Sequence, residues 1–185
     1  MATATKPHAD INAIRETIEA VRKEPGLGKV TFTMKSQSKG RLALETQTGP
    51  LYQNGEADVS RMGKFTLISD EPVSLLGGDT GVSPAEYALK ALAGCYAVTL
   101  ASMAASREIE LDGLQLNLAF DIDLNGFLGL DANVRKGAKA IRVDVKLDSN
   151  SATREQLEEL VRELPCQSPL HDTFANPVPV SASLL

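Results

Sequence analysis

The side chains best suited to chemistry in this sequence are the thiols of its two cysteines, Cys95 and Cys166. Cys95 ends a run of small and apolar residues, Ala91-Leu92-Ala93-Gly94-Cys95, beside which a ligand or another backbone can approach closely. A cysteine in such surroundings is either inert filling in a core or a reactive group kept from bulk water. A nearby cation favours the nucleophilic thiolate, whereas apolar burial opposes it. Thiol chemistry at Cys95 is the leading hypothesis, and an inert core cysteine is its alternative.

Other kinds of chemical site find little support in the sequence. With only His8 and His171 beside the two cysteines, the chain supplies ligands for a zinc site poorly, so we expect no metal. The glycines of Leu76–Gly81 lack the strand-GxGxxG-helix order of a dinucleotide site, so we expect a flexible connection and no cofactor. His171 and Asp172 follow Ser168 closely enough to suggest a serine hydrolase, but no Gly-x-Ser-x-Gly elbow surrounds that serine.

Composition limits the partners and the compartment. The net charge of -5 and the absence of a Lys/Arg block argue against nucleic acid, and 4% aromatic residues offer no stacking platform. The apolar run Ala91–Ala105 is shorter than the roughly 20 residues that span a bilayer, so we expect a buried core helix and no membrane partner. Two cysteines are too few for a secreted disulfide framework, and no secretory signal is visible. We therefore expect a cytoplasmic protein.

Capping residues and amphipathic patterns predict three helices, which together position Cys95 and its surroundings. The central one covers residues 84–105 and begins with Ser83 as N-cap, Pro84 at the first position and Glu86 completing a capping box. An amphipathic pattern predicts an earlier helix over residues 8–23, ended by Pro25-Gly26. A capping box of Thr153 and Gln156 starts a later helix, which we expect Pro165 to end.

Alternating apolar residues predict several antiparallel strands. A hairpin is expected over residues 29–46 with its turn at Ser38-Lys39-Gly40, and a short strand follows from Phe65. Two strongly alternating strands, 114–122 and 141–147, follow the central helix, and residues 178–182 read as a final edge strand. Because helices and antiparallel strands are segregated, the predicted class is α+β.

The run Gly77-Gly78-Asp79-Thr80-Gly81-Val82-Ser83-Pro84-Ala85-Glu86, followed by Ala91-Leu92-Ala93-Gly94-Cys95, resembles the osmotically inducible protein C and organic hydroperoxide resistance (OsmC/Ohr) family, in its OsmC-like branch. The resemblance implies antiparallel sheets wrapped around long central helices in an intertwined homodimer. It also implies an OsmC-like domain over residues 29–185, preceded by an N-terminal helical extension over residues 1–28.

The resemblance assigns roles to the two thiols. Peroxidatic members attack organic hydroperoxides with a cysteine that matches Cys95 and resolve the product with a second cysteine in a Cys-Pro stretch. Here Ser168-Pro169 occupies that stretch, and Cys166 lies two residues earlier. One alternative is that Cys166 still resolves Cys95. The other, which we favour, is a single-cysteine cycle that an external thiol reductant completes.

The resemblance also implies a glutamate and an arginine that polarise the first thiol. Glu86 matches the glutamate, but nine residues of helix, about 13 Å of rise, separate it from Cys95. Glu86 is therefore a capping residue alone, or it acts on Cys95 from the partner subunit or across a break in the helix near Gly94. The candidate arginines are Arg41 and Arg61, and each is shifted from the family's position.

The predicted function is thiol-dependent reduction of a small hydrophobic peroxide through Cys95, in defence against oxidative stress. The competing prediction is a non-catalytic family member that binds a small hydrophobic ligand at the dimer interface. The shifted Cys166 and the unplaced arginine favour this second possibility.

Overall fold

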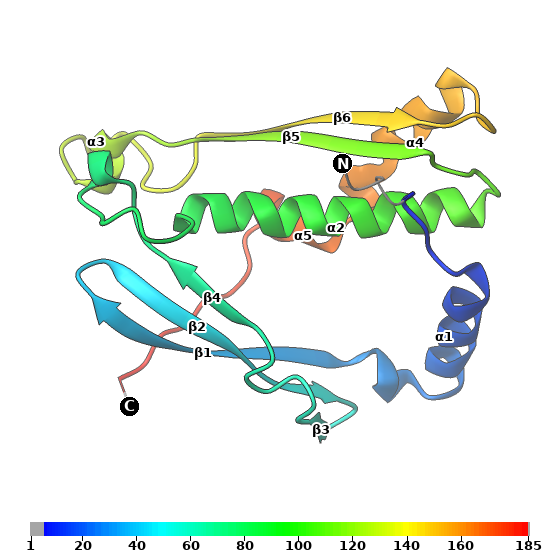
Figure 1. Ribbon diagram of the computed structural model, residues 1–185, viewed down its shortest axis with the longest axis horizontal. Helices are drawn as coiled ribbons and strands as arrows, with labels where there is room; N and C mark the ends of the chain where they lie inside the picture. Colours follow the sequence, from blue (N-terminus) through cyan, green and yellow to red (C-terminus); the bar gives the residue numbers. More distant parts are fainter. Residues whose placement is uncertain (1–5, 185) are drawn as a thin grey trace. The chain divides into compact units, whose positions relative to one another are not determined.

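The computed structural model describes residues 6–184, which form two compact units. One unit comprises residues 12–88, and the other joins residues 6–11 to residues 89–184. Helix α2 (Pro84–Ser106) contributes residues to both (Figure 1). The expected boundary between an extension and a domain at residue 28 stays a prediction.

The unit of residues 12–88 is built on a long β-hairpin. It begins with α1 (Ile11–Lys23), close to the predicted helix, and a 3-10 turn, η1 (Pro25–Gly28). Strand β1 (Val30–Gly40) then pairs antiparallel with β2 (Ala43–Gln53), which also pairs with β3 (Glu56–Asp58) and β4 (Thr66–Ser69) (Figure 1). The hairpin is confirmed, but its turn lies at Arg41-Leu42 and not at Ser38-Lys39-Gly40, because β1 keeps pairing through Gly40. Strand β2 is longer than expected because pairing resumes beyond a register shift near Gly49.

One face of this sheet is apolar and uncovered. Since paired residues of antiparallel strands share a face, the register places Val30, Phe32, Met34, Leu44 and Leu67 together. Phe32 is 76% exposed and Met34 52% exposed. Exposed apolar residues gathered on one sheet face, unlike scattered ones, mark a surface that another molecule covers.

Asp70 organises the glycine-rich loop that leads into α2. Its carboxylate is buried, with 3% exposure, and Oδ2 accepts hydrogen bonds from the backbone of Gly78 at 3.0 Å and from the Thr80 hydroxyl at 2.8 Å. Oδ1 accepts from the Glu71 backbone N–H at 2.9 Å. The loop, expected to be a flexible connection, is therefore tied down by one carboxylate.

Acidification is expected to destabilise this loop through Asp70. The Thr80 side chain above all, and then backbone N–H groups, lower the pKa of Asp70 although burial opposes them. A carboxyl whose pKa is lower in the folded state than in the unfolded state stabilises the fold at any pH above its unfolded pKa of about 3.9. This stabilisation is lost as the pH falls through the folded-state pKa. Asp70→Asn should lower the melting temperature at pH 7 by several degrees, and thermal scans between pH 7 and 2 should show a weaker acid dependence. Asp79→Asn in the same loop is the matched control, and an equal drop in both variants would contradict this role.

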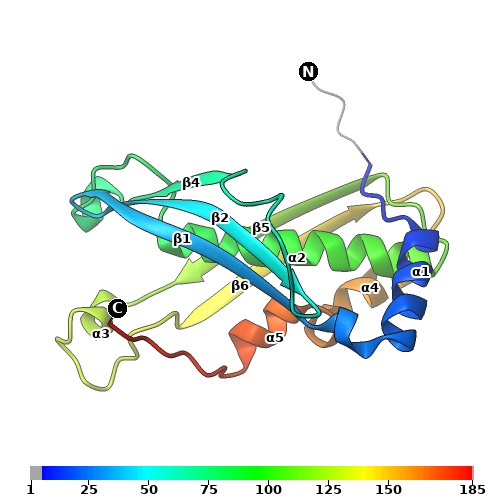
Figure 2. The same cartoon turned by 90° about the horizontal axis from the view of Figure 1, so that it is seen from below.

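The other unit surrounds the C-terminal part of α2. A two-stranded sheet of β5 (Gly113–Asp121) and β6 (Ala140–Asp148) lies along the helix, in the register Gly113 to Asp148 through Asp121 to Ala140 (Figure 1). Short helix α3 (Leu124–Phe127) lies in the connection that joins β5 to β6, and α4 (Arg154–Gln167) and α5 (Pro169–Ala175) follow β6 in the chain (Figure 2). Both strands and the capping box of Thr153 are confirmed. The buried core joins α2 and α4 through Leu92, Tyr96, Leu100, Ala104, Ile109, Leu111, Leu160 and Leu164.

Helix α2 is apolar on nearly all sides, but the chain itself buries one stripe of it. Leu92, Tyr96, Leu100 and Ala104 are buried, whereas Val98 is 68% exposed. By length and composition alone α2 could cross a membrane, a test that core helices of soluble proteins also pass. The expectation that most of its surface is buried therefore requires a second molecule.

The C-terminal region departs from expectation in two places. Helix α4 continues through Pro165 to Gln167, although proline removes one helical hydrogen bond, and the Ser168 N–H still bonds to the Leu164 carbonyl at 2.9 Å. The expected edge strand over 178–182 was wrong, since residues 177–184 form no strand. Pro177 and Pro179 remove alternate backbone donors, which an edge strand needs for pairing.

Candidate active site

Cys95 lies near the middle of α2 and faces the start of α5. The Ser168 hydroxyl donates a hydrogen bond to Cys95 Sγ at 3.2 Å. Ser168 is 2% exposed, and its Oγ accepts from the backbone N–H of His171 at 3.3 Å as the N-cap of α5. Pro169 then occupies the first turn. The hydroxyl is therefore held in place by the junction of α4 and α5, beside a half-buried thiol.

A second pair is formed by Tyr96, which follows Cys95, and His171, three residues after Ser168. The Tyr96 hydroxyl and Nδ1 of His171 are 2.6 Å apart, and the two rings stack with centroids 6.1 Å apart. Burial raises the pKa of Tyr96, and the adjacent Cys95 raises it further, so the phenol stays neutral and can donate to Nδ1. Sequence reasoning missed this pair, because neither residue belongs to a recognisable local motif.

The arrangement suits a cysteine nucleophile better than a serine nucleophile. The Ser168 hydroxyl donates a hydrogen bond to the Cys95 sulfur and so orients this side chain. The hydrolase alternative needs the His171 ring against Ser168, whereas this ring binds Tyr96 and only the His171 backbone contacts Ser168. The Ser168 hydroxyl therefore donates to Cys95, and its hydrogen bond from His171 comes from the backbone and not from the imidazole.

The side chain that hydrogen-bonds to the Cys95 sulfur belongs to Ser168 and not to Cys166. Cys166 lies in the last turn of α4, exposed, and both cysteines are free thiols. The residue in contact with the Cys95 sulfur is Ser168. The candidate resolving cysteine and the residue hydrogen-bonded to Cys95 are therefore different residues, and whether Cys166 resolves Cys95 stays a prediction.

The remaining candidates belong to the unit of residues 12–88. Glu86 completes the predicted capping box, since its Oε2 accepts from the Ser83 N–H at 2.9 Å and from the Ser83 hydroxyl at 2.7 Å. These two bonds, the backbone one first, lower the pKa of Glu86. Arg41 occupies the tip of the hairpin with a φ of 49°, and the Arg61 guanidinium lies 5.4 Å from the Phe65 ring centre. Their roles toward Cys95 stay predictions.

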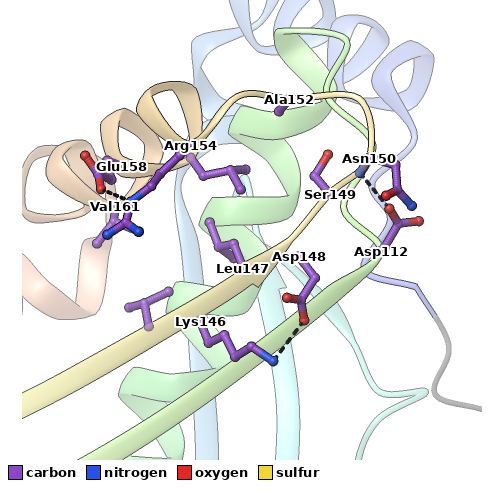
Figure 3. Close-up of a pocket in the computed structure, with 12 residues that line it drawn as sticks. Asp112, Lys146, Leu147, Asp148, Ser149, Asn150, Ala152, Arg154, Glu158 and Val161 are labelled. Atoms are coloured by element: carbon purple, nitrogen blue, oxygen red, sulfur yellow. Dashed lines mark hydrogen bonds and ion pairs between the residues drawn. The ribbon is translucent and has the colours of Figure 1, made fainter.

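A pocket on the unit of β5 and β6 contains none of these residues. It has a volume of about 750 Å³ and lies between the end of β6 and α4 (Figure 3). Its charged groups are already paired, Arg154 with Glu158 and Lys146 with Asp148, and Asp112 accepts from the Asn150 N–H (Figure 3). Within residues 6–184, no group of three or more His, Cys, Asp or Glu side chains is placed to hold a metal ion.

The family model for OsmC-like proteins matches residues 77–183, more than half of the chain. The chain belongs to the OsmC-like family. The matched part includes Cys95 and Ser168 and leaves Arg41 and Arg61 outside. The family assignment made from the glycine loop and Cys95 is thereby confirmed.

Solved structures of the family share the fold. An OsmC-like protein from Mycoplasma pneumoniae matches with a TM-score of 0.60 at 16% identity, over 78% of this chain and 87% of its own. An organic hydroperoxide resistance protein OsmC from Legionella pneumophila gives 0.54 at 17% identity, over 78% and 88%. The organic hydroperoxide resistance protein OhrB of Bacillus subtilis gives 0.50 at 19% identity, over 77% and 88%. The predicted α+β class with antiparallel sheets and a long central helix is confirmed; no curated protein sequence matches the chain.

Proposed function

We propose that this protein is a thiol-dependent peroxidase that reduces organic hydroperoxides through Cys95. The observation that carries the proposal is the hydrogen bond from the buried Ser168 hydroxyl to Cys95 Sγ. It holds in place the sulfur of the cysteine that matches the family's peroxidatic position. Two of the structural neighbours are named for organic hydroperoxide resistance. The reaction belongs in the cytoplasm, where free thiols persist.

The proposed cycle uses one protein thiol and two external thiols. The Cys95 thiolate attacks the outer oxygen of ROOH, the O–O bond breaks, and RO⁻ takes a proton to leave as the alcohol. Cys95 is then a sulfenic acid, oxidised by two electrons. One external thiol displaces water to form a mixed disulfide, and a second releases the reduced Cys95 and an external disulfide. No step needs Cys166.

The proposal also assigns roles to Glu86 and to Arg41 or Arg61, and it places them in a homodimer. Glu86 is anchored by Ser83 at the start of α2 and orients the polarising group from a partner subunit. Arg41 or Arg61 stabilises the charge that develops on the leaving oxygen. A homodimer is supported by the exposed apolar sheet face around Phe32 and by the exposed Val98 of α2.

Peroxide consumption tests the proposal. With a dithiol reductant, the protein is expected to consume cumene hydroperoxide, and Cys95→Ser should reduce the rate to background because it removes the nucleophile. Cys166→Ser is the matched control, and its rate should stay within about twofold of the unmodified protein. A coupled assay of residual hydroperoxide measures both variants.

Two results would contradict the proposal. An inert protein toward both cumene hydroperoxide and hydrogen peroxide would favour the non-catalytic member that binds a small hydrophobic ligand at the dimer interface. If Cys95→Ser and Cys166→Ser lose the same share of the rate, Cys166 takes part in the cycle, and the two-cysteine alternative holds in place of the single-cysteine cycle.

A further inference from the structure

A pocket separate from the Cys95 thiol lies inside the unit that contains β5, β6 and α5. Its volume is about 490 Å³, within the roughly 300–1,000 Å³ typical of small-molecule sites. Neither Cys95 nor Ser168 lines it. Its walls are mainly apolar and come from α2, both strands and α5: Leu92, Tyr96, Phe120, Ile141, Val143 and Phe174.

The charges around this pocket have one sign. Arg135 and Lys139 line it, and no aspartate or glutamate does. Lys139 Nζ is already bound to Asp123 at 2.9 Å. Arg135 is exposed, and no ion pair to a carboxylate of residues 6–184 is found for its guanidinium. Arg135 is therefore the cation available to a ligand.

The segment that carries Arg135 is held in place at both ends. Gly126 of α3 is buried, and a side chain there would collide with the carbonyl oxygens of Val134 and Arg135, so the backbone of this segment packs closely on α3. At the other end, the Lys139 N–H bonds to the Asp121 carbonyl at 2.7 Å. A fixed backbone leaves only the Arg135 side chain to be ordered when a ligand binds.

We propose that this pocket binds a small apolar molecule with a single anionic head group, carboxylate or phosphate, which pairs with Arg135. The planar guanidinium binds both groups with two parallel hydrogen bonds, while the apolar walls accept a chain or ring. The pocket wall includes the Tyr96–His171 pair, in which Tyr96 follows Cys95 and His171 lies three residues after Ser168. The site is independent of the proposed peroxidase activity.

Titration with three matched probes tests this site. Octanoate and octyl phosphate carry the two head groups, and octanamide is the neutral isostere of octanoate. Calorimetry should give octanoate or octyl phosphate an affinity about tenfold higher than that of octanamide, because a charge-assisted bond is lost in the amide. The tighter of the two anions identifies the head group.

Histidine signals locate the bound probe. The chain has two histidines, and His171 lines the pocket whereas His8 does not. Proton NMR should show the His171 ring signals shifting with the anionic probe while those of His8, assigned with His8→Gln, stay in place. An anion that binds without moving the His171 signals would overturn the proposal.

Two variants complete the test. Arg135→Gln should weaken the anionic probe about tenfold and leave octanamide unchanged. Lys136→Gln removes the same charge from the next residue, which does not line the pocket, and should have less than a twofold effect. Equal losses in both variants, or equal affinities for octanoate, octyl phosphate and octanamide, would refute an anion site. All titrations can use Cys95→Ser, so failure of the peroxidase proposal leaves this result readable.

Discussion

Replacing Ser168 with cysteine is expected to convert a protein with a single-cysteine cycle into one that closes a disulfide with Cys95. The Ser168 oxygen lies 3.2 Å from Cys95 Sγ, and a disulfide needs an S–S distance of about 2.05 Å. Because a cysteine side chain differs from serine only at this atom, a small movement brings the sulfurs together. Intact-mass analysis of Ser168→Cys after one equivalent of cumene hydroperoxide should therefore show a loss of two hydrogen atoms.

The unmodified protein should behave differently under the same oxidation. Cys166 is exposed, and the atom beside Cys95 is a hydroxyl oxygen, which cannot form a disulfide. We expect a gain of one oxygen atom, or a mixed disulfide when a small thiol is present. A loss of two hydrogens in the unmodified protein, abolished by either Cys95→Ser or Cys166→Ser, would show that Cys166 resolves Cys95. In Ser168→Cys, the control substitution Cys166→Ser should leave the new disulfide intact.

The sequence predicted the elements whose signals are local. The capping boxes of Ser83 with Glu86 and of Thr153 with Gln156 mark the starts of α2 and α4, because each box needs residues only three positions apart. Strands β5 and β6 were equally predictable, since one buried face enforces strict alternation. Helix α5 was missed, although Ser168 before Pro169 is a helix-start signal.

The active-site contacts could not be predicted in the same way. Ser168 is 73 residues from Cys95, and His171 is 75 residues from Tyr96. Such pairs depend on how α5 packs against α2, and no short pattern encodes that packing. The family resemblance placed Ser168 in the resolving position, but it gave no reason to expect the hydroxyl to bond to the thiol. The prediction that Pro165 ends the helix was wrong, because α4 continues to Gln167 and tolerates the loss of one backbone hydrogen bond at the proline.

Dissociation of the proposed homodimer is the largest effect that we expect outside the thiol site. Light scattering at micromolar concentration should give twice the 19.7 kDa of one chain. Phe32→Glu should produce a monomer, because Phe32 is 76% exposed on the apolar sheet face and each copy would lose roughly 2–3 kcal/mol of burial. With two copies in a symmetric interface, the dissociation constant should rise about a thousandfold.

The neighbouring residue provides the matched control for this variant. Thr31 is exposed on the same strand, and its side chain points to the opposite face of the sheet, where it pairs with Tyr52. Thr31→Glu adds the same charge one position away and should remain a dimer. Since Phe32 is exposed within one chain, Phe32→Glu should also keep a folded circular dichroism spectrum, which separates dissociation from unfolding. A stable monomer of the unmodified protein, or monomers from both variants, would contradict a dimer built on this face.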